Sequence, residues 1–161
     1  MLSNINLNNT SQVFREEKEK IESNELKLVG LYDPAENDLN LNMWELSDGE
    51  KIIKLVEKIQ KKHLSNDAQS IYKKLILTNA FPPENNINIE EFIDLKIKWL
   101  IKQDDLNLIK EFIIKNDKGK FNNKLIKYYL DKNLSIGKVD ESCDLFSSVK
   151  NIPDDNYILK Y

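Results

Sequence analysis

Apolar residues recur at three- and four-residue spacing through most of the chain after residue 47, which is typical of amphipathic helices. Polar side chains, many of them lysine and glutamate, occupy the positions between them. The spacing predicts six helices, over about residues 47–63, 65–77, 88–103, 104–116, 121–133 and 139–150. With only four glycines and four prolines, the chain has little of the turn chemistry that a β-sheet requires. The expected fold class is therefore all-α.

Capping residues support several of these boundaries. Ser47 with Glu50, and Asn88 with Glu91, have the spacing of a capping box, in which each side chain accepts a hydrogen bond from the other residue's amide. Ser65 or Asn66 is the expected N-cap of the second helix. Pro82-Pro83 prevents that helix from continuing, because proline has no amide hydrogen to donate.

The N-terminal part of the chain lacks helical spacing. Residues 1–24 are rich in Asn, Ser, Glu and Lys and are expected to form a disordered or weakly helical polar arm. Residues 25–46 are expected to form an extended segment that packs on the helices, because Asp33-Pro34 disfavours a helix. A local alternation of strand type supports this, at Leu39, Leu41 and Met43. Residues 47–161 would then form a helical-hairpin repeat domain, with truncation at its C-terminus left open as an alternative.

The repeat prediction rests on two similar helix pairs. Residues 87–116 and 121–151 each contain two short helices, and residues 154–161 begin a further apolar run. The segments 95–100 and 125–130 can be superposed, each ending in an aromatic residue followed by leucine. This arrangement predicts stacked hairpins that bury one another's apolar faces.

The helix-pair period and the pairs Trp99-Leu100 and Tyr129-Leu130 resemble tetratricopeptide-like (TPR-like) repeats over residues 87–161. The glycine that usually follows that leucine is absent, and Gln103-Asp104 and Lys132-Asn133 stand near its place. The resemblance implies a TPR-like α-α superhelix of about six helices with an extended N-terminal segment. Such superhelices bind peptides and proteins.

A second resemblance covers most of the chain from Gly30 onward. The segment Leu31-Tyr32-Asp33-Pro34-Ala35, the pair Met43-Trp44 and the pair Pro82-Pro83 are similar to features of alphaproteobacterial helical-repeat proteins with no assigned activity. This resemblance implies an architecture and a cell-envelope location, and it implies no site residues.

Composition and charge narrow the classes of function. The net charge of −3 comes from 24 basic and 27 acidic side chains that are mixed along the chain, which argues against a nucleic-acid partner. No apolar run reaches membrane-spanning length, and no secretion signal opens the chain. If Met1 is the native start, the expected location is the cytoplasm, whereas a fragment of a longer exported protein would belong to the cell envelope or periplasm.

Candidate catalytic and metal-binding residues have structural explanations. His63, the only histidine, lies at a predicted helix end, where the helix dipole favours a cation. Cys143, the only cysteine, is expected to be a small buried residue on one face with Val139 and Phe146. Pairs of carboxylates mostly precede or open helices, at 16–17, 90–91, 104–105, 140–141 and 154–155. We therefore expect a protein that is not an enzyme and has no cofactor or metal.

The expected function is that of a scaffold that binds a peptide or partner protein through its helical-repeat surface. Aromatic side chains often dominate such interfaces, although Trp99 and Tyr129 occupy matching repeat positions that favour packing between helices. The candidate partner-binding residues are Trp44, Lys127, Tyr128, Tyr157 and Tyr161. The two tyrosines near the C-terminus also suggest self-association through that end.

The alternative function is association with nucleic acid or anionic membranes through a lysine stripe, defined as Lys51, Lys54, Lys58, Lys61 and Lys62. Glu50 and Glu57 interrupt this stripe, and no aromatic residues alternate with the lysines. A solvated helix face is the simpler interpretation.

Overall fold

The computed structural model describes residues 28–117 and 122–149, and in these residues the chain is helical with no named β-strand. A short 3-10 turn, η1 (Ala35–Asn37), is followed by six α-helices. They are α2 (Gly49–Gln60), α3 (Asn66–Leu77), α4 (Ile89–Gln103), α5 (Leu106–Lys115), α6 (Asn123–Ser135) and α7 (Val139–Ser148). The predictions of an all-α chain and of about six helices are confirmed.

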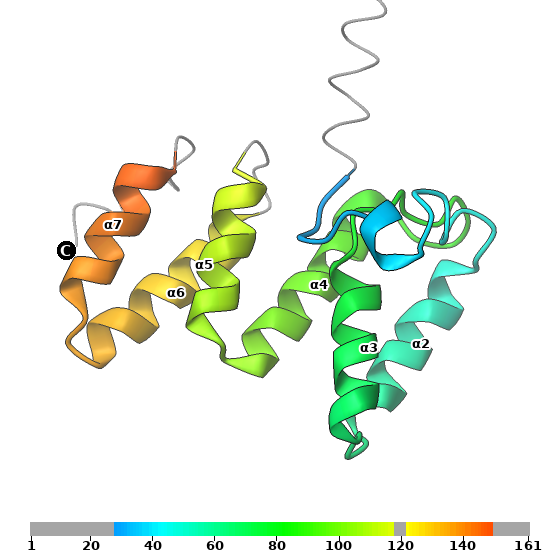
Figure 1. The fold of residues 1–161 in the computed structure, drawn as a ribbon, viewed down its shortest axis with the longest axis horizontal. Helices are drawn as coiled ribbons and strands as arrows, with labels where there is room; N and C mark the ends of the chain where they lie inside the picture. The colour runs from blue at the N-terminus through cyan, green and yellow to red at the C-terminus, as the bar shows by residue number, and fades with distance from the viewer. Residues whose placement is uncertain (1–27, 118–121, 150–161) are drawn as a thin grey trace, which may run out of the picture.

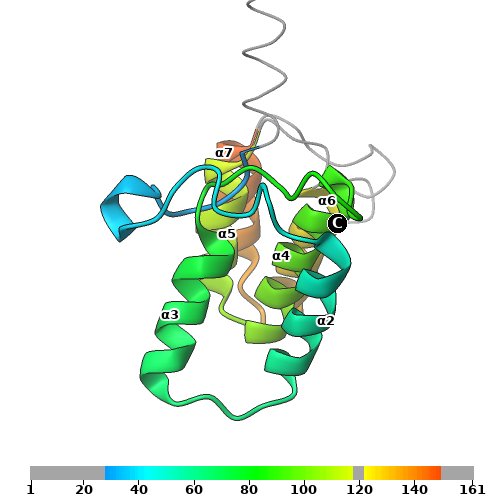
Figure 2. The same ribbon diagram turned by 90° about the vertical axis from the view of Figure 1, so that its right-hand side faces the viewer.

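The helices form three antiparallel hairpins, α2–α3, α4–α5 and α6–α7, which follow one another in chain order from right to left in Figure 1. Helix α4 packs closely against α5 and α6, and α5 packs closely against α6 and α7. Among the described helices, none of these closely packed pairs includes α2 or α3. Figure 2 shows that α2 and α3 run well apart and meet through the loop that joins them.

The caps explain where the helices begin. The capping box of Asn88 and Glu91 is present as predicted, and Ser65 caps α3 by accepting from the Ala68 amide. The predicted capping box of Ser47 is wrong, because Asp48 is the N-cap of α2 and accepts from the Lys51 amide at 3.0 Å.

A contact from outside the helix moves this boundary. Asp48 also accepts from the Asn86 side chain at 2.8 Å, and the Gly49 amide donates to the Asn85 carbonyl at 2.9 Å. A Cβ atom on Gly49 would lie 2.3 Å from that of Ile87, so only glycine fits this crossing. The loop before α4 therefore determines where α2 starts.

The core is concentrated in α4–α7. Side chains with no exposed surface include Leu100, Ile109, Phe112, Ile113 and Leu125. Trp99 and Tyr129 are also buried, so their predicted role in packing between helices is confirmed.

The face assigned to α7 from the sequence is wrong. Cys143 is exposed and Val139 is 53% exposed, whereas Ser142 and Leu145 are buried. Burial of Ser142 and Leu145 places Val139 and Cys143 toward solvent, and of the predicted face only Phe146 packs against the core.

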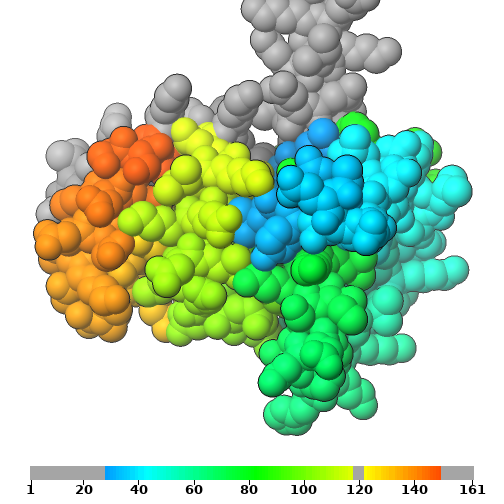
Figure 3. Space-filling model, viewed as in Figure 1, coloured from blue at the N-terminus to red at the C-terminus, as the bar shows by residue number. Residues whose placement is uncertain are grey.

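The first described residues form an N-terminal strap, defined as residues 28–32, which buries Val29 and Leu31. The Leu31 amide donates to the Leu77 carbonyl at 2.7 Å, and the Asn79 amide donates to the Tyr32 carbonyl at 2.9 Å. The strap thus pairs with the chain that leaves α3. In the space-filling view the blue residues at the start of the described chain lie between α5 and the α2–α3 hairpin (Figure 3).

Side chains from α4 and from the end of α5 bind the carbonyls of the strap in succession. Lys96 donates to the Val29 carbonyl at 2.5 Å, and Lys115 donates to the Leu31 carbonyl. Between them, the buried Asn116 side chain accepts from the Gly30 amide at 3.1 Å and donates to the Gly30 carbonyl at 3.2 Å. The Asn116 side-chain amide therefore makes the same pair of hydrogen bonds with Gly30 that a residue of a neighbouring β-strand would make.

Glycine is required at position 30 because the strap approaches other backbone closely. A Cβ atom there would lie 2.5 Å from the Leu77 carbonyl oxygen and 2.8 Å from the Asn79 nitrogen. Both neighbours are backbone atoms that are themselves hydrogen-bonded, so they cannot move aside cheaply.

The segment after the strap does not form the strand suggested by Leu39, Leu41 and Met43. Residues 41–46 form successive turns, with the Met43 amide donating to the Asn40 carbonyl at 3.1 Å. Alternation of apolar residues produces a strand only where a neighbouring strand supplies hydrogen bonds, and here one isolated bond reaches Leu41, from the Phe81 amide.

Within the described residues, no helix combines the length and apolar character needed to cross a lipid bilayer.

Candidate functional site

A pocket of about 500 Å³ lies where the ends of four helices meet. It is bounded by the ends of α2 and α4, the starts of α3 and α5, and the loop between α2 and α3. Its lining comprises Ile59, Gln60, Lys62, His63, Leu64, Asn66, Gln69, Ser70, Tyr72, Lys73, Trp99, Lys102, Gln103, Asp105 and Leu108. This volume is within the range of pockets that hold small ligands or the side chains of a peptide.

The pocket exists because the N-terminal part of α3 stands away from the rest of the molecule. The fully buried residues of α3 are Ile76 and Leu77, both at its C-terminal end, whereas Ile71 is 67% exposed. Tyr72 forms an edge-to-face contact with Trp99, with ring centroids 6.0 Å apart and an interplanar angle of 82°. Both rings belong to the lining of the pocket.

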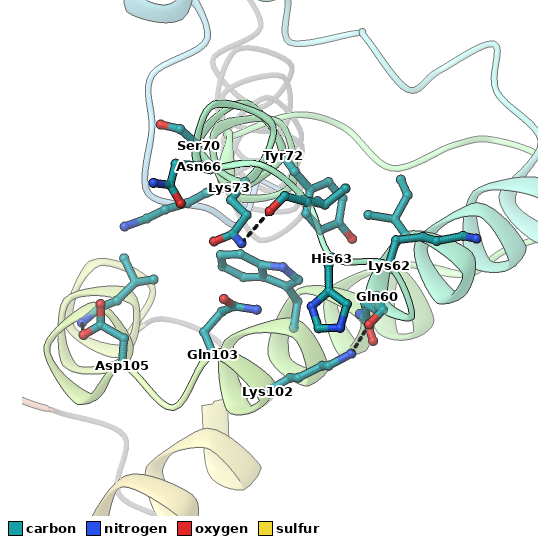
Figure 4. Close-up of a pocket in the computed structure, with 15 residues that line it drawn as sticks. Gln60, Lys62, His63, Asn66, Ser70, Tyr72, Lys73, Lys102, Gln103 and Asp105 are labelled. Atoms are coloured by element: carbon teal, nitrogen blue, oxygen red, sulfur yellow. Dashed lines mark hydrogen bonds between the residues drawn. The ribbon is translucent and has the colours of Figure 1, made fainter.

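Carboxamide side chains contribute much of the polar lining. They are Gln60, Asn66, Gln69 and Gln103. Gln69 donates to the Leu64 carbonyl at 3.1 Å and so fixes the loop between α2 and α3. In Figure 4, Gln103 extends from α4 on the side of the pocket opposite Ser70 and Lys73, which belong to α3. Each carboxamide offers both a donor and an acceptor to a ligand.

The charged lining is mainly basic, with three lysines and one aspartate. Lys102 donates to the Gln60 carbonyl and is therefore held at the end of α2. Lys62 and Lys73 extend to opposite sides of the pocket in Figure 4. Asp105 is the N-cap of α5 and accepts from the amides of Asn107 and Leu108, so part of its charge is compensated by the helix.

The Tyr72 phenol stays neutral in this setting. Burial raises the pKa of Tyr72 to about 12, and the nearby Gln60 side chain acts in the opposite direction. The hydroxyl and Gln60 do not reach hydrogen-bonding geometry with each other. The phenol is therefore a neutral hydrogen-bonding group at ordinary pH, and it does not act as a base.

The candidate residues predicted from the sequence are not brought together at this pocket. Trp44 is half-buried against Phe92, with ring centroids 6.0 Å apart. The Tyr128 hydroxyl donates to Asp104, and Lys127 is exposed on α6. Tyr157 and Tyr161 lie outside the described residues, so the proposed C-terminal surface stays a prediction.

Tyr128 instead has a structural partner at the turn between α4 and α5. Asp104, which adopts a left-handed conformation with φ of 55°, accepts from both Tyr128 and Lys132. The hydrogen bond from Lys132 and that from Tyr128 hold the pKa of Asp104 below its usual value. Asp104 thus supplies the left-handed turn between α4 and α5, a conformation that usually favours glycine, and it also links α6 to the preceding hairpin.

The other candidates can also be placed. The lysine stripe is exposed along and just after α2, and Lys54 pairs with Glu50 at 3.0 Å. The carboxylates at 90–91, 104–105 and 140–141 lie at helix boundaries as predicted, whereas 16–17 and 154–155 are outside the described residues. Within the described part of the chain, no cluster of three or more potential metal ligands occurs.

The residues that line this pocket come from stretches far apart in the sequence, and no sequence pattern predicted that they would meet. His63 was assigned to a helix end, which is where it lies, three residues after α2. Its place in the lining arises from the α2–α3 loop, and Lys102 and Gln103 come from a helix end about forty residues later. The sequence signal for this pocket is a concentration of polar residues at helix ends. Helix caps produce the same concentration, so the signal does not distinguish a pocket from a cap.

Comparisons of the chain with models of protein families, with curated proteins and with solved structures found no match.

Proposed function

We propose that this chain is a protein-interaction module, with its three hairpins arranged as a TPR-like α-α superhelix, and that it binds a peptide segment of a partner protein in the pocket between α2, α3, α4 and α5. The observation that carries the proposal is the lining of this pocket, which combines four carboxamide side chains with a buried tryptophan. It is a binding function without a chemical reaction.

The carboxamides favour a peptide over a wholly apolar ligand. A peptide group presents one N–H donor and one C=O acceptor, and a Gln or Asn side chain can pair with both. Gln103 on α4 and Gln69 on α3 belong to different walls of the pocket. A chain lying between these walls would exchange hydrogen bonds with water for hydrogen bonds with protein, while one side chain covers Trp99.

The loose attachment of α3 also supports this function. Because its N-terminal half contributes little to the core, this half can adjust to a ligand at small cost in packing energy. Binding would then be accompanied by closer packing of α3 on α4.

Selection of displayed peptides tests the proposal. A random peptide library is selected on the wild-type protein and, in parallel, on Ser70→Trp, which places a large side chain at the mouth of the pocket. Ser70 is exposed on α3, so the variant should fold. We expect enriched peptides to bind the wild type and to lose at least tenfold in affinity for Ser70→Trp by calorimetry, a change of about 1.4 kcal/mol.

Lys74→Trp is the matched control, because Lys74 is exposed on the same helix and does not line the pocket. Peptides should bind this variant as they bind the wild type. Peptides that bind Ser70→Trp equally well, or a selection without enrichment, would contradict the proposed function.

A second candidate function is association with nucleic acid or anionic membranes through the lysine stripe. The observation in its favour is that all five lysines are exposed on or just after one helix. Binding to duplex DNA or to vesicles with anionic lipid should then weaken steeply with salt and should be lost in a variant with Lys51 and Lys58 changed to Gln. Absence of binding at low salt would remove this candidate.

A further inference from the structure

We propose that the peptide bound in this pocket is acidic, with carboxylate side chains on both sides of the residue that covers Trp99; this inference rests on the proposed function. The charges of the lining carry it. Lys62 and Lys73 are contributed by the end of the α2 region and by α3, on opposite sides of the pocket.

The path of the peptide across the pocket follows from the positions of these lysines. A chain that crosses the pocket from the side of Lys73 to the side of Lys62 (Figure 4) crosses a lining to which Trp99 belongs. The ammonium groups can then meet carboxylates that precede and follow the central residue. Ion pairs at the rim contribute modestly to affinity, but they select against basic peptides by like-charge repulsion.

The acidic group of the lining does not cancel this preference. Asp105 lies near the start of α5, where two backbone amides bind one of its oxygens. Lys102 is held by the Gln60 carbonyl, an uncharged acceptor, so its positive charge is not neutralised by that contact. The lining therefore carries more positive than negative side chains, although the chain as a whole is acidic.

Charge reversal tests the inference. Peptides selected on the wild-type protein are compared with those selected on Lys62→Glu/Lys73→Glu. We expect Asp and Glu to be enriched in the first set, and Lys or Arg to replace them in the second. An acidic peptide from the first set should bind the double variant at least tenfold more weakly, and its wild-type affinity should decrease as NaCl is raised from 50 to 300 mM.

Lys58→Glu is the matched control, because it changes the same net charge per residue on the exposed face of α2 without touching the pocket. It should retain the acidic peptide. Equal loss in Lys58→Glu and in Lys62→Glu or Lys73→Glu would show attraction by net charge alone and would overturn the inference. Inhibition by millimolar acetate or phosphate as strong as that by the peptide would also overturn it, because any anion would then suffice.

The outcomes for the two proposals are distinct. Peptides that require an open pocket but show no acidic enrichment leave the proposed function in place and overturn the acidic preference. Peptides that ignore Ser70→Trp overturn both. A charge-reversed variant that binds neutral and acidic peptides as the wild type does would overturn the acidic preference alone.

Discussion

The α4–α7 helices and the α2–α3 hairpin differ in how they are held. In α4–α7 each helix packs on its neighbours, and the most deeply buried side chains, such as Ile109 and Leu125, lie there. In α2–α3 the helices are apart, and both Leu55 and Ile71 remain more than half exposed. Helices α4–α7 therefore form a closely packed core, whereas α2 and α3 pack loosely and can change position more easily.

The two regions are held by different kinds of contact. Helices α4–α7 are fixed by apolar burial and by polar links across hairpins, such as Lys124 to Asp94 at 3.0 Å and Lys110 to Glu141 at 2.9 Å. Helix α3 is fixed at its C-terminal end by the strap, which bonds to the Leu77 carbonyl. One end of α3 is therefore anchored, and the other end forms the pocket.

The largest expected effect is on the core of α4–α7. Phe112→Ala removes a side chain with no exposed surface and should lower the free energy of unfolding by about 3–5 kcal/mol. Ile71→Ala on α3 should change it by less than about 0.5 kcal/mol. Urea denaturation measures both, and the milder Ile113→Val, with an expected loss of about 1 kcal/mol, provides a value if Phe112→Ala does not fold. Equal losses for Phe112→Ala and Ile71→Ala would contradict the comparison.

The second largest loss in the free energy of unfolding is expected when the strap loses its side-chain partner. Asn116→Ala leaves the Gly30 amide and carbonyl without their side-chain partner and should cost about 2–3 kcal/mol. Hydrogen exchange at Gly30 should accelerate more than exchange in α6. Asn107→Ala, an exposed change near the other end of α5, serves as the control. Unchanged exchange at Gly30 would show that Asn116 does not hold the strap.

Lys96 should make stability depend on pH. Burial lowers the pKa of Lys96 from 10.5 to about 7 in the folded chain. Between about pH 7 and 10.5 the unfolded chain thus carries a proton that the folded chain lacks, so stability rises with pH. The gain from pH 7 to pH 9 should be about 2 kcal/mol.

Lys96→Met provides the comparison for that measurement. Without a titrating group at this position, the gain between pH 7 and pH 9 should disappear. Chemical denaturation at the two pH values measures it. The same gain in Lys96→Met as in the wild type would assign the pH dependence to other groups.

The smallest effect concerns Cys143. Because this thiol is exposed on α7, it should react with a disulfide reagent in the native protein as fast as in urea. Cys143→Ala should change the free energy of unfolding by less than about 0.5 kcal/mol. Protection of the thiol in the native state would contradict this exposure and would support the buried position expected from the sequence.

The local features of the fold could be predicted, and its long-range features could not. Helical spacing and the capping box of Asn88 are encoded within a few neighbouring positions, and they appear in the structure. The strap depends on Asn116, which is 86 positions from Gly30, and nothing near either residue indicates that they meet. The error at Cys143 has a similar cause, because a short helix with few apolar residues can be rotated by its neighbours.

The candidate site was hidden from the sequence for a related reason. Its walls come from the ends of separate helices, so its residues share no spacing or motif. Trp44 and Tyr128 were reasonable candidates as aromatics, but one packs on Phe92 and the other binds Asp104. A large aromatic side chain is expected to bury its surface, but only the fold determines whether it packs against a helix or against a ligand.

The long reach of the strap has a consequence for synthesis of the chain. Val29, Gly30 and Leu31 leave the ribosome before α2–α7, but the side chains that bind their carbonyls belong to residues 96, 115 and 116. Helices α2 and α3 must therefore emerge before their N-terminal anchor can close. Attachment of the strap becomes a late step in folding, because it joins Gly30 to the end of a helix made roughly eighty positions later.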